Sequence, residues 1–164
     1  MRRRDRRIES WEEIVSILRR GEVCFLSMVD DGKPYVVPLN YGYEENALYF
    51  HTAPAGRKID ILRRNPGVCF SILDRCELVK GEKACSWSSN YCSVTGTGKA
   101  RILTSREEVE NGLEILMGHY SEEEFDFTGM KLDNIVIIRV EIGTLTGKSS
   151  DAGTRGSGDA EKSR

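Results

Sequence analysis

The sequence lacks long apolar runs, and this shortage narrows the classes of protein to which it can belong. Its longest apolar stretches are only as long as a strand, so we expect no segment that spans a membrane. No apolar run follows the N-terminal arginines, so we expect no secretory signal. A formal net charge of −2 gives no overall attraction to nucleic acid or to a lipid surface. We therefore predict a cytoplasmic protein that has neither nucleic acid nor a membrane as its partner.

The sequence also lacks closely spaced cysteines. Its five cysteines are an odd number without a CxxC pair, and we interpret them as reduced thiols. Zinc accepts thiolate and imidazole ligands, so one alternative is a zinc site built from Cys76, Cys85, Cys92 and His119. These residues do not have the short ligand spacing of a structural zinc knuckle, and we predict no metal site.

Both ends of the chain are polar. The length of 164 residues fits one domain, which we place over residues 1–148. Residues 149–164 are rich in glycine, serine and charged side chains, so we predict a disordered tail. Residues 2–7 form an arginine run that only Asp5 interrupts. Such a run could contact nucleic acid or an anionic lipid surface, but we interpret it as a solvated tail, or as a cover for an acidic patch on a partner subunit.

Hydrophobic periodicity predicts three helices and six strands. Capping boxes at Ser10–Glu13 and Ser105–Glu108 begin two of the helices, and Asp31-Gly32 is typical of a hairpin turn. The strands are expected over residues 23–29, 34–43, 47–52, 67–74, 91–103 and 134–146, and the remaining helix over residues 56–64. Strands outnumber helices and the early links are short. This pattern favours a mainly β fold, with an antiparallel sheet closed into a barrel.

Two of these strands contain residues that disturb regular pairing. Pro38 lies within the strand expected over residues 34–43, although proline cannot donate a hydrogen bond to a neighbouring strand. We therefore predict that the backbone of Val37, Pro38 and Leu39 is not paired on both sides. Gly96 and Gly98 leave room for the close approach of a neighbouring backbone or of a ligand.

The stretch YFHTAPAGRKIDIL, residues 49–62, predicts a seat for a phosphate group. It begins as a strand, turns at small residues and continues as a helix that has Arg57 and Lys58 in its first turn. The N-terminus of a helix is itself partly positive, so cations there are disfavoured by about 0.3–1 kcal/mol each. An anion bound to the free backbone N–H groups would make the same two cations favourable.

The basic pair also has a simpler interpretation. Asp60, together with Glu44 or Glu45, would neutralise the two cations, which would then both be solvated. The sequence leaves both interpretations open.

Three segments identify a family when they are taken in order. They are PYVVPLNYGY, LYFHTAPAGRKIDILRRNP, and YCSVTGTGKARIL followed by a capped helix. The chain resembles the flavin-binding split-barrel proteins related to pyridoxamine 5′-phosphate oxidase. Within that family it looks like the branch named for 5-nitroimidazole resistance, which the N-terminal MRRRDRRI and the final LTGKS also resemble. The resemblance covers roughly residues 1–148.

The resemblance implies a six-stranded antiparallel FMN-binding split barrel of Greek-key type. It also implies a homodimer with FMN in clefts at the subunit interface. Lys58 and Arg57 would hold the FMN phosphate, with Thr52 donating a hydroxyl, and His51 would lie near the flavin and the substrate. The backbone of Val37, Pro38 and Leu39 would run along the isoalloxazine. Tyr91 and Ser93 would lie on the strand that reaches the ligand of the neighbouring subunit.

Each of these residues also has a structural interpretation. His51 could be a half-buried histidine whose hydrogen bonds are satisfied, and Tyr91 could be an aromatic side chain of an interface. Nothing local distinguishes Ser93 from the other polar residues of its strand. We interpret Lys148 as a solvated strand end.

The resemblance predicts an FMN-dependent oxidoreductase that reduces a small flat acceptor, for example a nitro-aromatic such as a 5-nitroimidazole. His51 would orient the acceptor or supply a proton, because the pKa of an imidazole is close to working pH. Oxidation of pyridoxamine phosphate is not expected, because the substrate-phosphate residues of the true oxidases have no counterpart in this tail. No GxGxxG fingerprint joins a strand to a helix, so a nicotinamide donor would visit transiently.

Two alternatives use the same barrel. One is a non-catalytic protein that binds flavin or haem, with His51 or His119 as an axial iron ligand. The other is a reductase that uses a deazaflavin.

Overall fold

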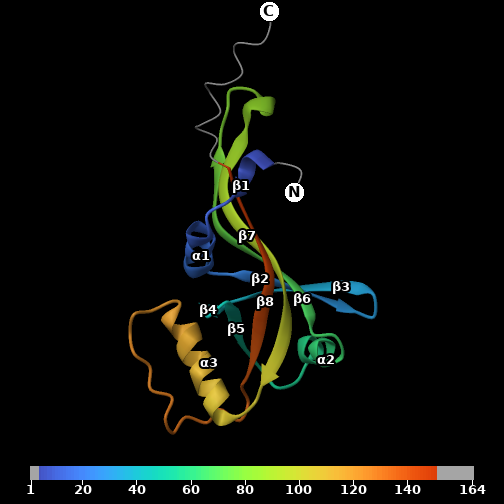
Figure 1. Cartoon of the computed structure of the whole chain (residues 1–164), viewed down its shortest axis with the longest axis vertical. Helices are drawn as coiled ribbons and strands as arrows, with labels where there is room; N and C mark the ends of the chain where they lie inside the picture. Colours follow the sequence, from blue (N-terminus) through green and yellow to red (C-terminus); the bar gives the residue numbers. More distant parts are fainter. Residues whose placement is uncertain (1–3, 151–164) are drawn as a thin grey trace, which may run out of the picture.

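Residues 4–150 of the chain are described in a computed structural model. In chain order the elements are η1 (Arg4–Arg6), β1 (Arg7–Ile8), α1 (Trp11–Arg20), β2 (Cys24–Asp30), β3 (Lys33–Leu39), β4 (Gly42–Glu44), β5 (Ala47–Thr52), α2 (Arg57–Arg64), β6 (Gly67–Val79), η2 (Ala84–Ser86), β7 (Ser88–Leu103), α3 (Arg106–Gly118) and β8 (Val136–Ser150). The α-helices lie around one strongly twisted sheet (Figure 1). In these described residues no helix has both the length and the apolar character that crossing a membrane requires.

All strand pairs of the sheet are antiparallel, in the order β3-β2-β6-β7-β8-β5-β4, with β1 paired to β8. Eight strands are formed where six were expected. β1 is a short addition, and the strand expected over residues 34–43 is divided at Asn40 and Tyr41 into β3 and β4. The division has a physical cause, because the backbone N–H of Tyr41 donates to the hydroxyl of Tyr120 at 2.9 Å instead of to a strand.

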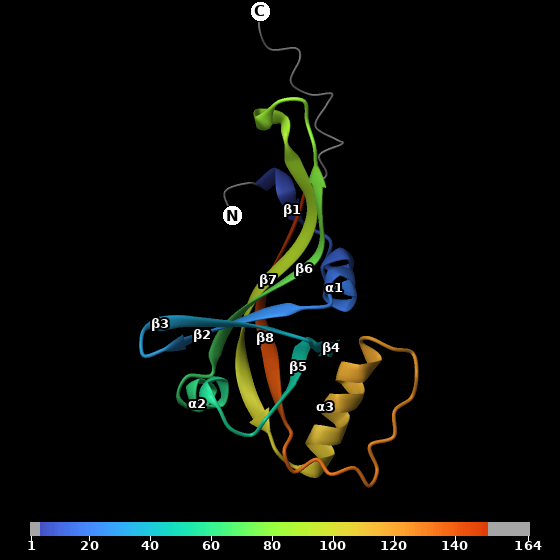
Figure 2. The same ribbon diagram turned by 180° about the vertical axis from the view of Figure 1, so that it is seen from behind.

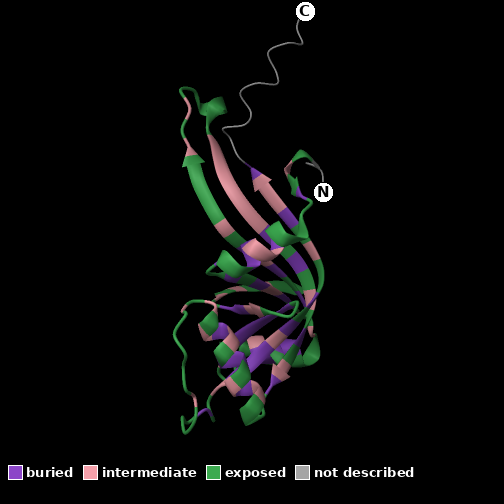
Figure 3. Cartoon of the chain, turned by 60° about the vertical axis from the view of Figure 1, so that its left-hand side comes forward, coloured by how far each residue is buried: buried purple, intermediate pink, exposed green. Residues whose placement is uncertain are grey.

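Two hydrophobic clusters cover the two faces of β5. Leu48 and Phe50 pack into the larger cluster with residues of α1, α2, β2 and β6. Ala47 and Tyr49 pack into the smaller cluster with residues of α3 and β8. Successive strand residues point to opposite faces, so this alternation explains why four consecutive residues of β5 are buried. Figure 3 shows that buried residues gather in the body of the sheet and thin out along β6 and β7.

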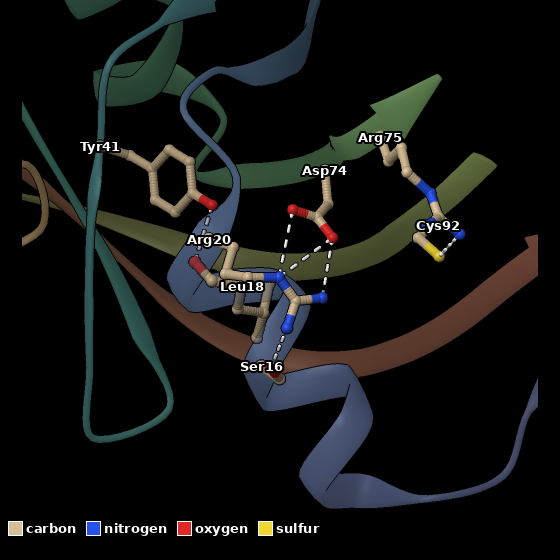
Figure 4. A network of polar contacts seen from close by, with 7 residues as sticks. All are labelled: Ser16, Leu18, Arg20, Tyr41, Asp74, Arg75 and Cys92. Carbon is tan, nitrogen blue, oxygen red and sulfur yellow. Dashed lines mark hydrogen bonds and ion pairs between the residues drawn. The ribbon is translucent and has the colours of Figure 1, made fainter. Parts of the chain in front are cut away.

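The hairpin of β6 and β7 extends beyond the body as an arm that ends in η2, which is visible from both sides (Figures 1 and 2). A register shift between Leu73 and Arg75 marks its base and leaves Asp74 as the extra residue. The carboxylate of Asp74 accepts a hydrogen bond from Arg20 at 2.8 Å, and Arg20 also donates to Ser16 (Figure 4). This network fastens the end of α1 to the base of the arm.

The expectations for Pro38 and for the strand glycines are confirmed. β3 is an edge strand that pairs only with β2, so the missing N–H of Pro38 breaks no second ladder. A Cβ on Gly96 would lie 2.4 Å from the ring of Phe70 and 2.6 Å from the carbonyl oxygen of Thr144. The close approach is therefore made by neighbouring strands.

The boundary at the C-terminal end differs slightly from the expectation. β8 continues through Ser149 and Ser150, which the sequence assigned to the tail, because both residues pair with β7. The remainder of the predicted tail lies outside the described residues, as do Met1 and the first two residues of the arginine run.

Candidate functional site

The turn between β5 and α2 forms the predicted basic helix start. Gly56 precedes α2 with a φ of 121°, a conformation that side chains rarely adopt, and it offers no side chain to cap the helix. The first intrahelical bond runs from the N–H of Asp60 to the carbonyl of Gly56 at 3.1 Å. The N–H groups of Arg57, Lys58 and Ile59 are therefore left without a side-chain cap. A Cβ on Gly56 would meet no atom within 4 Å, so the space on that side of Gly56 is open.

Arg57 already has interaction partners within the chain. Its Nε donates to Asp30 at 3.0 Å, and its guanidinium lies 4.4 Å from the centre of the Tyr35 ring. Asp30 also accepts a hydrogen bond from Arg64 at 2.7 Å. The alternative neutralising partners, Asp60 with Glu44 or Glu45, were therefore wrong for Arg57. The partner is a residue of β2 instead, because the hairpin of β2 and β3 brings the end of that strand to α2.

Lys58 differs from its neighbour. Its side chain is half-buried, and burial lowers the pKa of its ammonium group. Among residues 4–150 no carboxylate forms an ion pair with it, and no hydrogen bond of its side chain is found. Lys58 is thus a partly desolvated cation at an uncapped helix N-terminus, where a bound anion would compensate both the charge and the lost solvation.

The other predicted residues near this helix lie on two strands. Val37 and Leu39 pack partly against the larger cluster, whereas Pro38 between them is exposed on the edge strand. His51 is exposed on β5 opposite Ile137, and Thr52 is half-buried where β5 ends. His51 and Thr52 therefore point to opposite faces of β5. The buried interpretation of His51 does not hold within the single chain.

Tyr91 and Ser93 form a second group near the base of the arm. Tyr91 lies opposite Ser150 of β8, and Ser93 lies opposite Lys148, which is also the partner of Arg7 in β1. In both views β1 lies far from α2 (Figures 1 and 2). The chain by itself therefore divides the predicted site residues into two groups.

The second group contains two cations that the sequence did not assign to a site. Nη1 of Arg6 donates to the hydroxyl of Tyr91 at 3.1 Å, and Nζ of Lys148 lies 5.5 Å from the centre of the same ring. Burial raises the pKa of Tyr91, but the hydrogen bonds and positive charges of Arg6 and Lys148 outweigh it, so that this pKa lies below its ordinary value. The interpretation of Lys148 as a solvated strand end was wrong, because the side chain is half-buried beside Tyr91. We call Arg6, Tyr91 and Lys148 the tyrosine cluster.

His119 has a structural role. Nε2 of its ring lies 2.7 Å from the carbonyl oxygen of Gly21, and the ring packs against Tyr41 with their centres 4.6 Å apart. Within the described part of the chain, no three side chains among histidine, cysteine, aspartate and glutamate are grouped as a metal would need. Four hollows of the described structure lie around α3, and none of them is lined by a residue predicted to hold the flavin, although His119 lines one of them.

A family model described as pyridoxamine 5′-phosphate oxidase matches residues 10–149. The chain belongs to this oxidase family. The assignment confirms the family that the three sequence segments resembled. The matched residues include α2, Tyr91 and Lys148. Arg6 precedes them.

Solved structures extend the comparison. A candidate 5-nitroimidazole antibiotic resistance protein from Bacteroides thetaiotaomicron VPI-5482 is 35% identical, with a TM-score of 0.77 over 87% of this chain and 86% of that chain. The flavocytochrome Anf3 from Azotobacter vinelandii is 18% identical, with a TM-score of 0.78 over 92% of this chain and 72% of that chain. An FAD and heme binding protein from Mycobacterium smegmatis is also 18% identical, with a TM-score of 0.78 over 89% of this chain and 74% of that chain. The last two show the fold alone, and together the three confirm the split barrel.

One curated relative matches a shorter part of the sequence. It is an uncharacterized protein of Rhizobium meliloti (strain 1021), 37% identical over 68 residues, which are 42% of this chain. The match spans 44% of the length of that relative.

Proposed function

We propose that the protein is an FMN-dependent oxidoreductase that reduces a small flat acceptor, such as a nitro-aromatic compound. The observation that carries this proposal is the state of Lys58, a half-buried cation without an ion-pair partner in the described chain, beside the uncapped N–H groups of α2. A phosphate monoester fits this arrangement, since it accepts hydrogen bonds from backbone N–H groups and from an ammonium group. The 35% identity to the Bacteroides protein supports a nitro-aromatic acceptor.

Each group around the proposed flavin has a separate task. Lys58 and the first N–H groups of α2 hold the phosphate, and the hydroxyl of Thr52 donates to it. β3 pairs with β2 on one side only. Its other edge, at Val37, Pro38 and Leu39, is available to the ring system. When bound, FMN supplies the electron transfer, and the protein supplies position and electrostatics. The nicotinamide donor visits transiently.

His51 is the proposed catalytic residue. Its imidazole is exposed at the end of β5, one residue before Thr52. It is therefore accessible to an acceptor, which it orients or to which it supplies a proton. Replacement of His51 by alanine should leave FMN affinity unchanged and lower the rate of acceptor reduction. Unaltered reduction kinetics would remove His51 from the reaction.

We further propose that the active form is a homodimer with the clefts at the subunit interface. β2, β3 and β6 expose large apolar side chains on the face of the sheet opposite to the larger cluster: Phe25 is 45% exposed, Val36 56% and Leu73 44%. An exposed apolar face of this kind is typical of a surface that packs against a partner. A second copy on this face would bring Tyr91 and Ser93 of one subunit toward the ligand of the other.

The first test is the absorbance spectrum of the purified protein before and after FMN is added. Oxidised-flavin bands that stay with the protein through gel filtration, at the elution volume of a dimer, would support the proposal. A Soret band would instead favour the haem-binding alternative, for which the exposed His51 is the available axial ligand, since His119 contacts Gly21. A deazaflavin retained from the cells would be recognised by its own spectrum. No uptake of FMN would overturn the proposal.

A further inference from the structure

The tyrosine cluster brings together three segments that are distant in the sequence. Arg6 comes from η1, Tyr91 from β7 and Lys148 from β8. The guanidinium carbon of Arg6 lies 5.9 Å from the centre of the Tyr91 ring, and Nζ of Lys148 lies 5.5 Å from it. Two positive charges therefore share one aromatic ring, and all three side chains are half-buried. Such a concentration of like charge is unfavourable unless a negative group compensates it.

The cluster has more hydrogen-bond donors than acceptors. The phenol oxygen of Tyr91 accepts from Nη1 of Arg6, so the O–H of Tyr91 is left to donate elsewhere. Nε of Arg6 is buried and has no hydrogen-bond partner in the described chain. A buried donor without a partner is costly, which indicates that a group completing the cluster is missing from the single chain.

The carboxylate of Glu9 pairs with Arg7 at 3.4 Å and not with a cation of the cluster. The remaining neighbours are small: Ser93 donates to the carbonyl of Lys148 at 3.5 Å, and Cys76 lies opposite Tyr91 on β6. The donors of the cluster thus lie beside hydroxyl and thiol groups.

We propose that Arg6, Tyr91 and Lys148 form a seat for a small oxyanion, either a carboxylate or a tetrahedral group such as phosphate or sulfate. The guanidinium and the ammonium supply charge, and the phenol O–H supplies a directed donor. These are the groups that recognise oxyanions in proteins. Within one chain the seat is separate from the one at Lys58, because it uses no residue of α2.

The seat lies next to the exposed apolar face of the sheet. Tyr91, Ser93 and Lys148 lie on the same face of the sheet as Leu73, because Leu73 is opposite Ser93 and Ser93 is opposite Lys148. The seat therefore borders the apolar face that we assign to the second subunit. An oxyanion held there would lie at the edge of the subunit interface, which suits the charged end of a substrate that enters along that edge.

The tyrosine itself reports on the seat. The full-length protein, without added flavin, is titrated to alkaline pH while tyrosinate absorbance is followed, first in sodium chloride and then in sodium sulfate at equal ionic strength. One of the six tyrosines should ionise ahead of the others in chloride, and Tyr91→Phe should remove this phase. Sulfate should move the phase to higher pH, because a bound negative charge disfavours a phenolate. Repeating the titration with acetate distinguishes carboxylates from tetrahedral anions.

Variants separate the two seats. Arg6→Gln and Lys148→Gln should each weaken sulfate binding, measured by calorimetry, at least tenfold, and Arg6→Lys should recover part of the loss. Lys58→Gln is the matched control, which should weaken FMN binding and leave the tyrosinate response to sulfate intact. A sulfate response that persists in the Arg6→Gln Lys148→Gln double variant would overturn the proposal. A second result would also overturn it: sulfate has no effect on the parent protein, and the double variant becomes a monomer. A carboxylate of the partner subunit would then complete the cluster.

Discussion

The two basic regions of this molecule differ in how the chain builds them. At α2 the two cations are neighbours in the sequence but differ in their ion pairs. Arg57 is paired with Asp30, whereas Lys58 has no such partner among the described residues. The tyrosine cluster instead combines residues 6, 91 and 148, and both of its cations approach one ring. Adjacency in sequence thus does not give two cations one role, and separation in sequence does not prevent a shared role.

The largest expected effect is a difference in FMN affinity between variants of Lys58 and of Arg57. Lys58→Ala should weaken FMN binding by about 1.5–3 kcal/mol, the size of a hydrogen bond to a charged group. Arg57→Ala should have a smaller effect, because Arg57 already has Asp30 and Tyr35 as partners. Both dissociation constants can be measured from flavin fluorescence. An equal loss in the two variants would remove the distinction between the cations.

The next effect concerns pH. Burial lowers the pKa of Lys58, and only the protonated form of Lys58 attracts a phosphate. As pH rises through this lowered pKa, the ammonium loses its charge and the dissociation constant of FMN should rise, by up to about tenfold for each pH unit. Lys58→Arg stays charged over this range, so its affinity should remain level. An alkaline loss of affinity that is the same in both proteins would assign the titration to another group.

A smaller effect tests the anchor of Arg57. Asp30→Asn should reduce the free energy of unfolding by about 1 kcal/mol, because Asp30 joins Arg57 and Arg64 through pairs in which the arginines are half exposed. Asp31→Asn is the matched control, since Asp31 is exposed in the hairpin turn at a φ of 48° that asparagine tolerates. Urea unfolding measures both. If the two variants are equally stable, the Asp30 ion pairs contribute nothing measurable.

Local signals in the sequence predicted most of the elements. Ser105 and Glu108 form the reciprocal capping box that begins α3. Ser10 accepts from the N–H of Glu13 as expected, although its own hydroxyl donates to Glu12. These features depend on residues a few positions apart, so periodicity and spacing reveal them.

Contacts between distant segments set the features that the sequence could not reveal. The bond from the N–H of Tyr41 to Tyr120 divides a strand that the apolar pattern joined. Asp30 reaches Arg57 only because the hairpin of β2 and β3 lies beside α2. Arg6 was part of a basic run, and only its pairing with Tyr91 across 85 positions distinguishes it from the other arginines. A signal of this kind would need covariation between positions, which one sequence does not contain.

The most direct test of the account compares FMN with riboflavin, which lacks the phosphate, on the parent protein and on Lys58→Ala. If Lys58 and the start of α2 hold the phosphate, the parent protein should prefer FMN by about tenfold or more, and the variant should lose most of that preference while its riboflavin affinity stays the same. A preference for FMN that is equal in the two proteins would contradict the account, because the phosphate would then be bound elsewhere.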